Sequence, residues 1–267
     1  MSTRRCGSCG WLRIIVAGAV GWAVAAHAEN VVYLKNGQTT KGTVKWKEST
    51  GEYVVVDPEG TIVPIPKAQV DHLEIDKPAD FDKAAQMVNA GQVDQGIPLL
   101  DAIVTEYKMR VWDNKAREVL ALAYLRKNDP KKAVDVMDPL IASVPKAEIE
   151  PDTQLLYWRA LLGANRAQTL KKELDDTIAT GPKELAAAAQ IMRGDMNRAQ
   201  GLKEDALLDY FRTIVLFEAV KAAQPEALFK AAELLDELRD PRAGDVRKKL
   251  VGEYPNSEFA NKAKAKL

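Results

Sequence analysis

The feature that most constrains this chain is an internal repeat with a period of about 37 residues. Prolines at positions 145, 182 and 255 end successive helical stretches and stand about one and two periods apart. A small or apolar residue recurs at the same period, at Gly96, Ala133, Leu170, Ala206 and Ala243. Larger residues follow at the fourth and seventh positions after most of these, as one face of a packed helix requires. Residues 78–267 are therefore predicted to be mainly α-helical, with about five helix pairs stacked into an α-solenoid.

The repeats carry a recognisable pattern of residues in both helices of a pair. The second block has it most completely, with Leu120, Ala121, Tyr124, Ala133, Met137, Leu140 and Pro145. The last block is close to it, with Ala231, Leu234, Ala243, Leu250 and Tyr254 followed by Pro255. This pattern resembles the tetratricopeptide repeat family in a somewhat lengthened form. Lys83 in the first block and Trp158 in the third depart from it, which leaves the number of repeats open. The resemblance implies a right-handed superhelix with a concave groove for protein partners.

The resemblance also implies which side chains face that groove. The candidates come from the first helix of several pairs: Leu122, Arg126, Leu155, Arg159, Leu162 and Leu228. Some proteins of the family clamp a peptide's terminal carboxylate with Lys and Asn, and these residue types are missing at the corresponding places. Leu and Arg there suit either an apolar partner segment or packing between repeats. Packing is the favoured interpretation for most of them, because a narrow superhelix buries part of this face.

Residues 29–77 show a different pattern, of short β-branched runs separated by turn residues. Five strands in a meander are predicted, with a tight hairpin at Asn36-Gly37, where both residues tolerate positive φ. Pro64 and Pro66 cannot donate ladder hydrogen bonds, so their strand is expected at a sheet edge. So short a segment buries little core in an open sheet, which favours a small closed barrel. The pattern resembles SH3-like barrels of bacterial envelope proteins, and that resemblance implies a binding or adaptor module.

Two residues of this β segment could take part in a site. Trp46 alternates with Val44 and is expected to pack in the core, with an exposed ligand-stacking face as the alternative. His72 is expected to be a solvated surface residue. No further metal ligands accompany it in this segment, so no metal site is predicted.

The first 28 residues have the composition of a secretory signal peptide. Arg4, Arg5 and Arg13 precede an uncharged run, and Ala26-His27-Ala28 offers small residues at a cleavage site. The run is shorter than the roughly 20 residues that a membrane-spanning helix needs, although an uncleaved anchor remains the alternative. Cleavage after Ala28 is predicted, and with it a periplasmic or secreted protein.

Removal of this leader changes what chemistry the chain can perform. The full chain has 38 basic and 38 acidic residues, and losing three arginines makes it slightly acidic, which argues against a nucleic-acid partner. Cys6 and Cys9 leave with the leader, and His72 becomes the only histidine. Phosphate-loop, dinucleotide and zinc-protease motifs are missing. No enzyme activity, cofactor or metal is therefore predicted.

These observations favour an exported, non-enzymatic scaffold or adaptor that binds protein partners through its helical repeats. Two alternatives stay open: a cell-envelope anchor that binds peptidoglycan through the β segment, and an accessory subunit of an outer-membrane assembly or secretion complex. The last residues, with Ser257 as a helix N-cap, are expected to form a capping helix.

Overall fold

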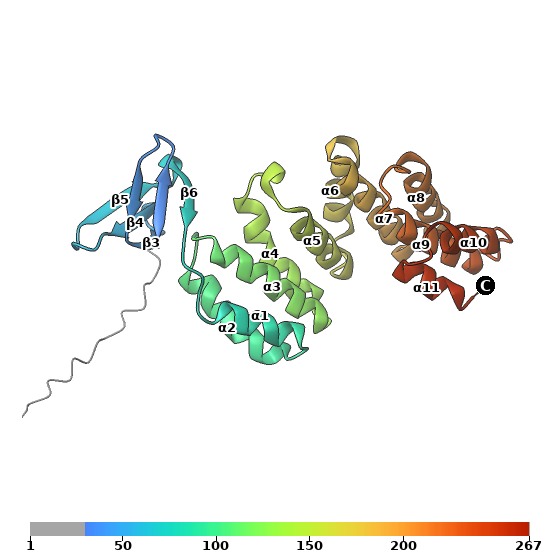
Figure 1. Ribbon diagram of the computed structural model, residues 1–267, viewed down its shortest axis with the longest axis horizontal. Helices are drawn as coiled ribbons and strands as arrows, with labels where there is room; N and C mark the ends of the chain where they lie inside the picture. Colours follow the sequence, from blue (N-terminus) through green and yellow to red (C-terminus); the bar gives the residue numbers. More distant parts are fainter. Residues whose placement is uncertain (1–29, 267) are drawn as a thin grey trace, which may run out of the picture.

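The computed structural model describes residues 30–266, with an N-terminal β region at one end and paired helices extending from it to the C-terminus (Figure 1). The predicted signal peptide and its cleavage site lie outside the described residues. Within residues 30–266, no helix combines the length and the hydropathy needed to span a membrane.

The β region contains six strands in two three-stranded sheets. The first sheet has the order β2-β1-β6 and the second the order β3-β4-β5, all antiparallel. The strands are β1 (Val31–Leu34), β2 (Thr39–Lys41), β3 (Thr43–Lys47), β4 (Glu52–Val56), β5 (Ile62–Pro66) and β6 (Val70–Glu74). The prediction of five strands missed β2, and the predicted meander is wrong because β6 returns to pair with β1. The strand that contains Pro64 is at an edge, as predicted.

The predicted closed barrel is not confirmed, because two breaks keep the sheets apart. Between β2 and β3 the chain turns at Gly42, whose φ is 147°. A Cβ there would lie 2.2 Å from the carbonyl oxygen of Val56, so only glycine fits. Between β5 and β6, the short 3₁₀ helix η1 (Lys67–Gln69) replaces strand pairing. The two sheets still share one apolar core, made by Val32, Val44, Tyr53, Val55 and Ile65.

The helical region consists of five helix pairs and one further helix. The first helices are α1 (Phe81–Asn89), α3 (Trp112–Arg126), α5 (Pro151–Gly163), α7 (Lys183–Ala199) and α9 (Gln224–Glu237). The second helices are α2 (Val93–Glu106), α4 (Pro130–Ser143), α6 (Ala167–Thr180), α8 (Lys203–Leu216) and α10 (Ala243–Glu253). The 3₁₀ helix η2 (Lys146–Glu148) precedes α5, and α11 (Glu258–Lys264) follows α10. Ser257 caps α11 by accepting a hydrogen bond from the Ala260 backbone N–H at 3.0 Å.

The repeat positions identified in the sequence are buried in the second helices. The small or apolar position is buried in every pair, and so are the positions four and seven residues later. First helices of neighbouring pairs also contact one another, α1 with α3, α3 with α5 and α5 with α7. The pairs therefore follow one another in a solenoid-like array (Figure 1).

Within residues 30–266, the β region is attached to the helices by four hydrogen bonds outside the linker, one of which is an exposed ion pair between Lys108 Nζ and Glu48 Oε1 at 2.6 Å. The Trp112 indole N–H donates to the Ile75 carbonyl at 2.8 Å, and Arg110 Nη1 donates to the Val44 carbonyl at 2.8 Å. The Tyr53 hydroxyl donates to the Met109 carbonyl, also at 2.8 Å. Met109 and Val111 have φ of 61° and 72°, in the left-handed region that non-glycine residues rarely adopt. The loop between α2 and α3 thus holds the β region against the first helix pairs.

Candidate partner-binding groove

Three of the sequence-predicted groove residues lie together in a cavity of about 340 Å³ formed by α5, α7, α9 and the segment that precedes α9. We call this cavity the groove. Its apolar lining consists of Leu155, Leu162, Ala188, Ile191, Met192, Val220, Ala222 and Ala223. Its charged lining consists of Arg159, Glu184, Asp195, Glu226 and Lys230. Leu155, Arg159 and Leu162 share one face of α5 because they are four and three residues apart.

Two charged side chains in the groove have no partner within residues 30–266. Arg159 and Glu184 are both exposed, and neither makes a hydrogen bond or ion pair with another described residue. Lys230, in contrast, is paired with Asp195 and with Glu226, the latter at 2.8 Å. An apolar surface with one free cation and one free anion can bind an apolar segment and orient it through its charges.

Part-buried polar contacts connect the helices at the groove. The Tyr210 hydroxyl donates a hydrogen bond to Asp195 Oδ1 at 2.8 Å, which connects α8 to α7. Burial and the negative charge of Asp195 raise the pKa of Tyr210, so it stays neutral and keeps donating. Lys230 extends the chain of contacts from Asp195 to α9. These contacts connect α7 and α9, two of the three helices that line the groove, to each other and to α8.

A second polar network lies behind the groove, centred on the buried Asp209 of α8. One carboxylate oxygen accepts hydrogen bonds from Gln190 at 2.6 Å, from Arg193 at 2.8 Å and from Arg212 at 3.2 Å. The other oxygen accepts from Arg193 at 3.2 Å and from Asn197 at 2.9 Å. Arg193 also donates to Asp175 of α6 at 2.7 Å. The network connects α6, α7 and α8 and leaves neither oxygen of Asp209 unsatisfied.

The remaining predicted groove residues lie elsewhere and have other contacts. Leu228 is 1% exposed within the core of α9, so its contacts are packing contacts. Leu122 is half-buried against the core of the first two pairs. Arg126 is exposed, and its guanidinium donates to the Val88 carbonyl at the end of α1. The structure thus brings together the three candidates of α5 and leaves those of α3 and α9 outside the groove.

The two β-region candidates are apart from the groove. Trp46 is half-buried and packs edge-on against Tyr53, with ring centroids 5.0 Å apart. His72 is exposed and stacks on Tyr33 with ring centroids 4.2 Å apart, while its Nδ1 lies 2.8 Å from Asp71. Within residues 30–266, no group of three or more His, Cys, Asp or Glu side chains is arranged to hold a metal ion.

Sequence reasoning missed the part of the groove that α7 and the segment before α9 contribute. Ile191 and Met192 stand in an Ala-rich helix in which most positions are buried, so the pattern does not distinguish the groove side from the core side. Val220 lies between helices, where no periodicity applies. Whether Glu184 is paired depends on neighbours from other helices, so the sequence around it could not predict that it is unpaired.

Comparison with known families identifies one of the helix pairs. Residues 226–257 match the family model described as tetratricopeptide repeat. The match covers nearly all of α9 and the whole of α10, the pair that contains Ala231, Ala243 and Leu250. No curated protein matches the chain. The matched pair and the array of helix pairs that precedes it together support a tetratricopeptide repeat protein.

Proposed function

We propose that this protein is a non-enzymatic scaffold whose groove binds a segment of a protein partner. The observation that carries the proposal is the arrangement of Arg159 between Leu155 and Leu162 on α5, opposite Glu184 of α7. A guanidinium is more weakly hydrated than an ammonium and can form bidentate pairs, and Arg is enriched where interfaces have their strongest contacts. Tetratricopeptide repeats typically act as interaction modules rather than as enzymes, which supports the same function.

The proposal includes export to the bacterial periplasm, where the protein acts as an adaptor. Its support is the composition of the first 28 residues, in which three arginines precede an uncharged run that ends at Ala26-His27-Ala28. Fractionation of cells that produce the full chain tests it: a shortened protein in the osmotic-shock fraction is expected. A full-length protein in the cytoplasm would contradict export. Peptidoglycan binding through the β region and membership of an outer-membrane complex stay predictions.

Site-specific photo-crosslinking in cells tests the groove. A benzophenone amino acid at position 159 is expected to crosslink a partner protein, because this side chain is exposed within the groove. The matched control is position 208, where Leu208 is 47% exposed on α8 but does not line the groove. A Leu155→Ser/Leu162→Ser variant should lose the crosslink at 159. Equal crosslinking at 159 and 208, or none at 159, would overturn the proposal.

A further inference from the structure

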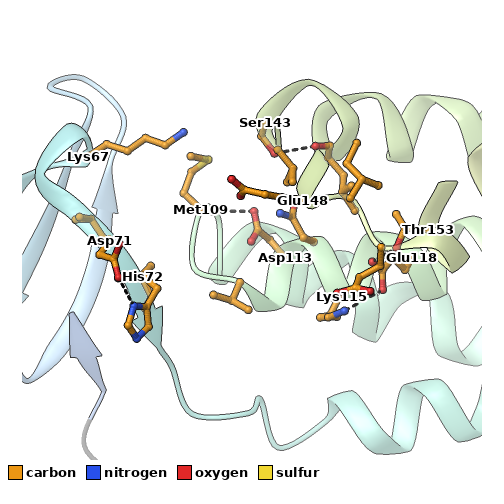
Figure 2. A pocket seen from close by; sticks show the side chains of 18 of the residues that line it. Lys67, Asp71, His72, Met109, Asp113, Lys115, Glu118, Ser143, Glu148 and Thr153 are labelled. Carbon is orange, nitrogen blue, oxygen red and sulfur yellow. Dashed lines mark hydrogen bonds and ion pairs between the residues drawn. The ribbon is translucent and has the colours of Figure 1, made fainter. Parts of the chain in front are cut away.

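A second cavity lies between the β region and the helical region, where α3, the end of α4 and the start of α5 line it, apart from the groove. Its volume is about 410 Å³, within the range of ligand sites. We call it the junction cleft. Figure 2 shows Lys67, Asp71 and His72 on the β side, with Asp113 and Glu148 facing them from the helical side. Residues from α3, the end of α4 and the loop before α5 complete its lining.

The junction cleft carries more negative than positive charge. Its acidic side chains are Asp71, Asp113, Glu118, Glu148 and Glu150, and its basic ones are Lys67 and Lys115. Lys115 is already paired with Glu118 at 3.6 Å. Glu148 and Glu150 are exposed, and their side chains have no hydrogen bond or ion pair with another described residue. Two unpaired carboxylates thus stand on the loop that borders the cleft, against one unpaired cation, Lys67.

Asp113, which lines the cleft, has one carboxylate oxygen without a donor among the described residues. It is 4% exposed, and its Oδ2 accepts the Met109 backbone N–H at 2.8 Å. Its Oδ1 is buried and receives no hydrogen bond from any described residue. A buried carboxylate oxygen without a donor is costly, so natural proteins rarely retain one without a use. A ligand that donates a hydrogen bond would remove this cost.

Gln154 has a similar unpaired acceptor on the other side of the loop that carries Glu148 and Glu150. It is 8% exposed, and its Oε1 is a second buried acceptor without a donor among the described residues. It lines a neighbouring cavity of about 710 Å³, and Glu148, Ile149 and Glu150 line both that cavity and the junction cleft. The unmatched acceptors therefore flank one loop, with the two free carboxylates between them.

The arrangement favours an extended organic cation over a metal ion. A divalent ion needs several oxygen ligands at about 2.0–2.6 Å, and no such group exists among residues 30–266. A lysine ammonium or an arginine guanidinium, by contrast, has several N–H donors at the end of its side chain and can pair with more than one carboxylate, while the peptide backbone donates to a side-chain amide.

We propose that the junction cleft binds a lysine- or arginine-containing segment of a protein partner. The basic side chain pairs with Glu148 and Glu150 and donates to Asp113 Oδ1, and a backbone N–H of the segment donates to Gln154 Oε1. Because Asp113 Oδ1 is covered in the free chain, its contact with the ligand requires a local opening of the cleft. This site is independent of the groove, so one can fail while the other stands.

Fluorescence anisotropy with the full chain tests the site. The probe is a labelled peptide of alternating Lys and Gly with blocked ends, and the same peptide with acetyl-lysine is the uncharged control. Glu148→Gln/Glu150→Gln should weaken binding of the Lys peptide about tenfold, because it removes two ion pairs. Both side chains are exposed and unpaired, so the variant should fold like the parent. Asp113→Asn should also weaken binding, because its carboxylate no longer attracts the cation.

The matched control removes the same charge elsewhere. This control is Glu204→Gln/Glu253→Gln, on α8 and α10. Both side chains are exposed and have no partner among the described residues. The control variant should change the affinity for the Lys peptide by less than about twofold. Equal weakening by both double variants would mean that general attraction to an acidic chain explains binding, and would overturn the site. Two other results would also overturn the site. One is that the acetyl-lysine peptide binds as tightly as the Lys peptide, and the other is that the Lys peptide does not bind the parent.

Discussion

Two buried aspartates, Asp209 behind the groove and Asp113 at the junction cleft, are equally inaccessible but differently satisfied. Asp209 is 1% exposed and both of its oxygens accept hydrogen bonds from side chains of α7 and α8. Asp113 is 4% exposed and one of its oxygens accepts nothing from the described residues. Burial alone therefore does not distinguish a structural carboxylate from a candidate binding carboxylate, whereas the count of donors does.

The two regions thus differ in pairing: the buried carboxylate of Asp209 is fully hydrogen-bonded, whereas that of Asp113 has one oxygen without a donor among the described residues. Around Asp209, charges are paired across three helices. Burial would raise the pKa of Asp175, but hydrogen bonds from Lys171 and Arg193 outweigh this effect and lower it. Around Asp113, the backbone adopts positive φ at Met109 and Val111, and Glu148 and Glu150 are free. The following substitutions test whether this contrast holds.

The largest effect is expected for Asp209→Ala. Removing this carboxylate leaves Arg193 without one of its two partners and leaves the buried Gln190 amide without an acceptor. We expect the free energy of unfolding to fall by about 3–5 kcal/mol, as when one partner of a buried ion pair is removed. Urea unfolding followed by circular dichroism measures it. Asp205→Ala, at an exposed position of the same helix, is the control and should change stability little. A loss below about 1 kcal/mol at Asp209 would contradict the contrast.

A smaller loss is expected for Gly194→Ala, which tests how closely α7 and α8 pack. An added Cβ would lie 2.5 Å from Tyr210 Cε1, and the buried ring is held by its hydrogen bond to Asp195. Overpacking of this kind costs about 1–3 kcal/mol. Gly244→Ala on α10 is the control, since a Cβ there meets nothing within 4 Å. That control should be neutral or slightly stabilising, because alanine favours the helix. Equal effects at the two glycines would show that α7 and α8 can separate freely.

Asp113→Asn should change stability by less than about 1 kcal/mol, since the buried charge it removes is only half satisfied. The asparagine oxygen can still accept the Met109 N–H, so the loop should keep its conformation. The same urea experiment measures the change, side by side with Asp209→Asn. If Asp113→Asn proved as destabilising as Asp209→Asn, Asp113 would be a structural residue, and its free oxygen would lose its significance.

The most subtle effect concerns Tyr53, the neighbour of Asp113 at the junction. Burial, and after it the negative charge of Asp113, raises the pKa of Tyr53 to about 12. The folded chain therefore keeps this proton when the unfolded chain loses it, so stability falls as pH rises from 10 to about 12. Asp113→Asn should lower the pKa of Tyr53. The measurement is a pH titration of tyrosinate absorbance, and the difference from the Tyr53→Phe variant isolates the signal of Tyr53. An unchanged pKa would show that the two groups do not interact.

The fold was largely predictable where burial follows a local period. Ala133, Met137 and Leu140 were assigned to one packed face of a helix, and all three are buried. The Ser257 cap and the edge strand with Pro64 were also predicted, because each depends on the backbone of its own segment. The closed barrel was not confirmed, because whether β2 continues into β3 depends on the close approach of Gly42 to Val56, 14 positions away in the chain.

The candidate site was predictable only in part. Arg159 was identified from its place in the first helix of a pair, yet Arg126 occupies a similar place in α3 and donates to α1 instead. The difference arises because Arg126 lies near the Val88 carbonyl at the end of α1, whereas no carboxylate or carbonyl of a described residue pairs with Arg159. Such neighbours come from other helices and leave no trace in the local sequence.

The sequence by itself determined the repeat and the pairing of helices, because these depend on residue spacing. The tertiary structure alone decided which charges are paired. Asp209 meets Arg193 from the preceding helix, whereas Glu184, Glu148 and Asp113 Oδ1 meet no donor among the described residues. Pairing depends on distances of a few ångströms between segments far apart in the chain, and those distances exist only after the helices have packed.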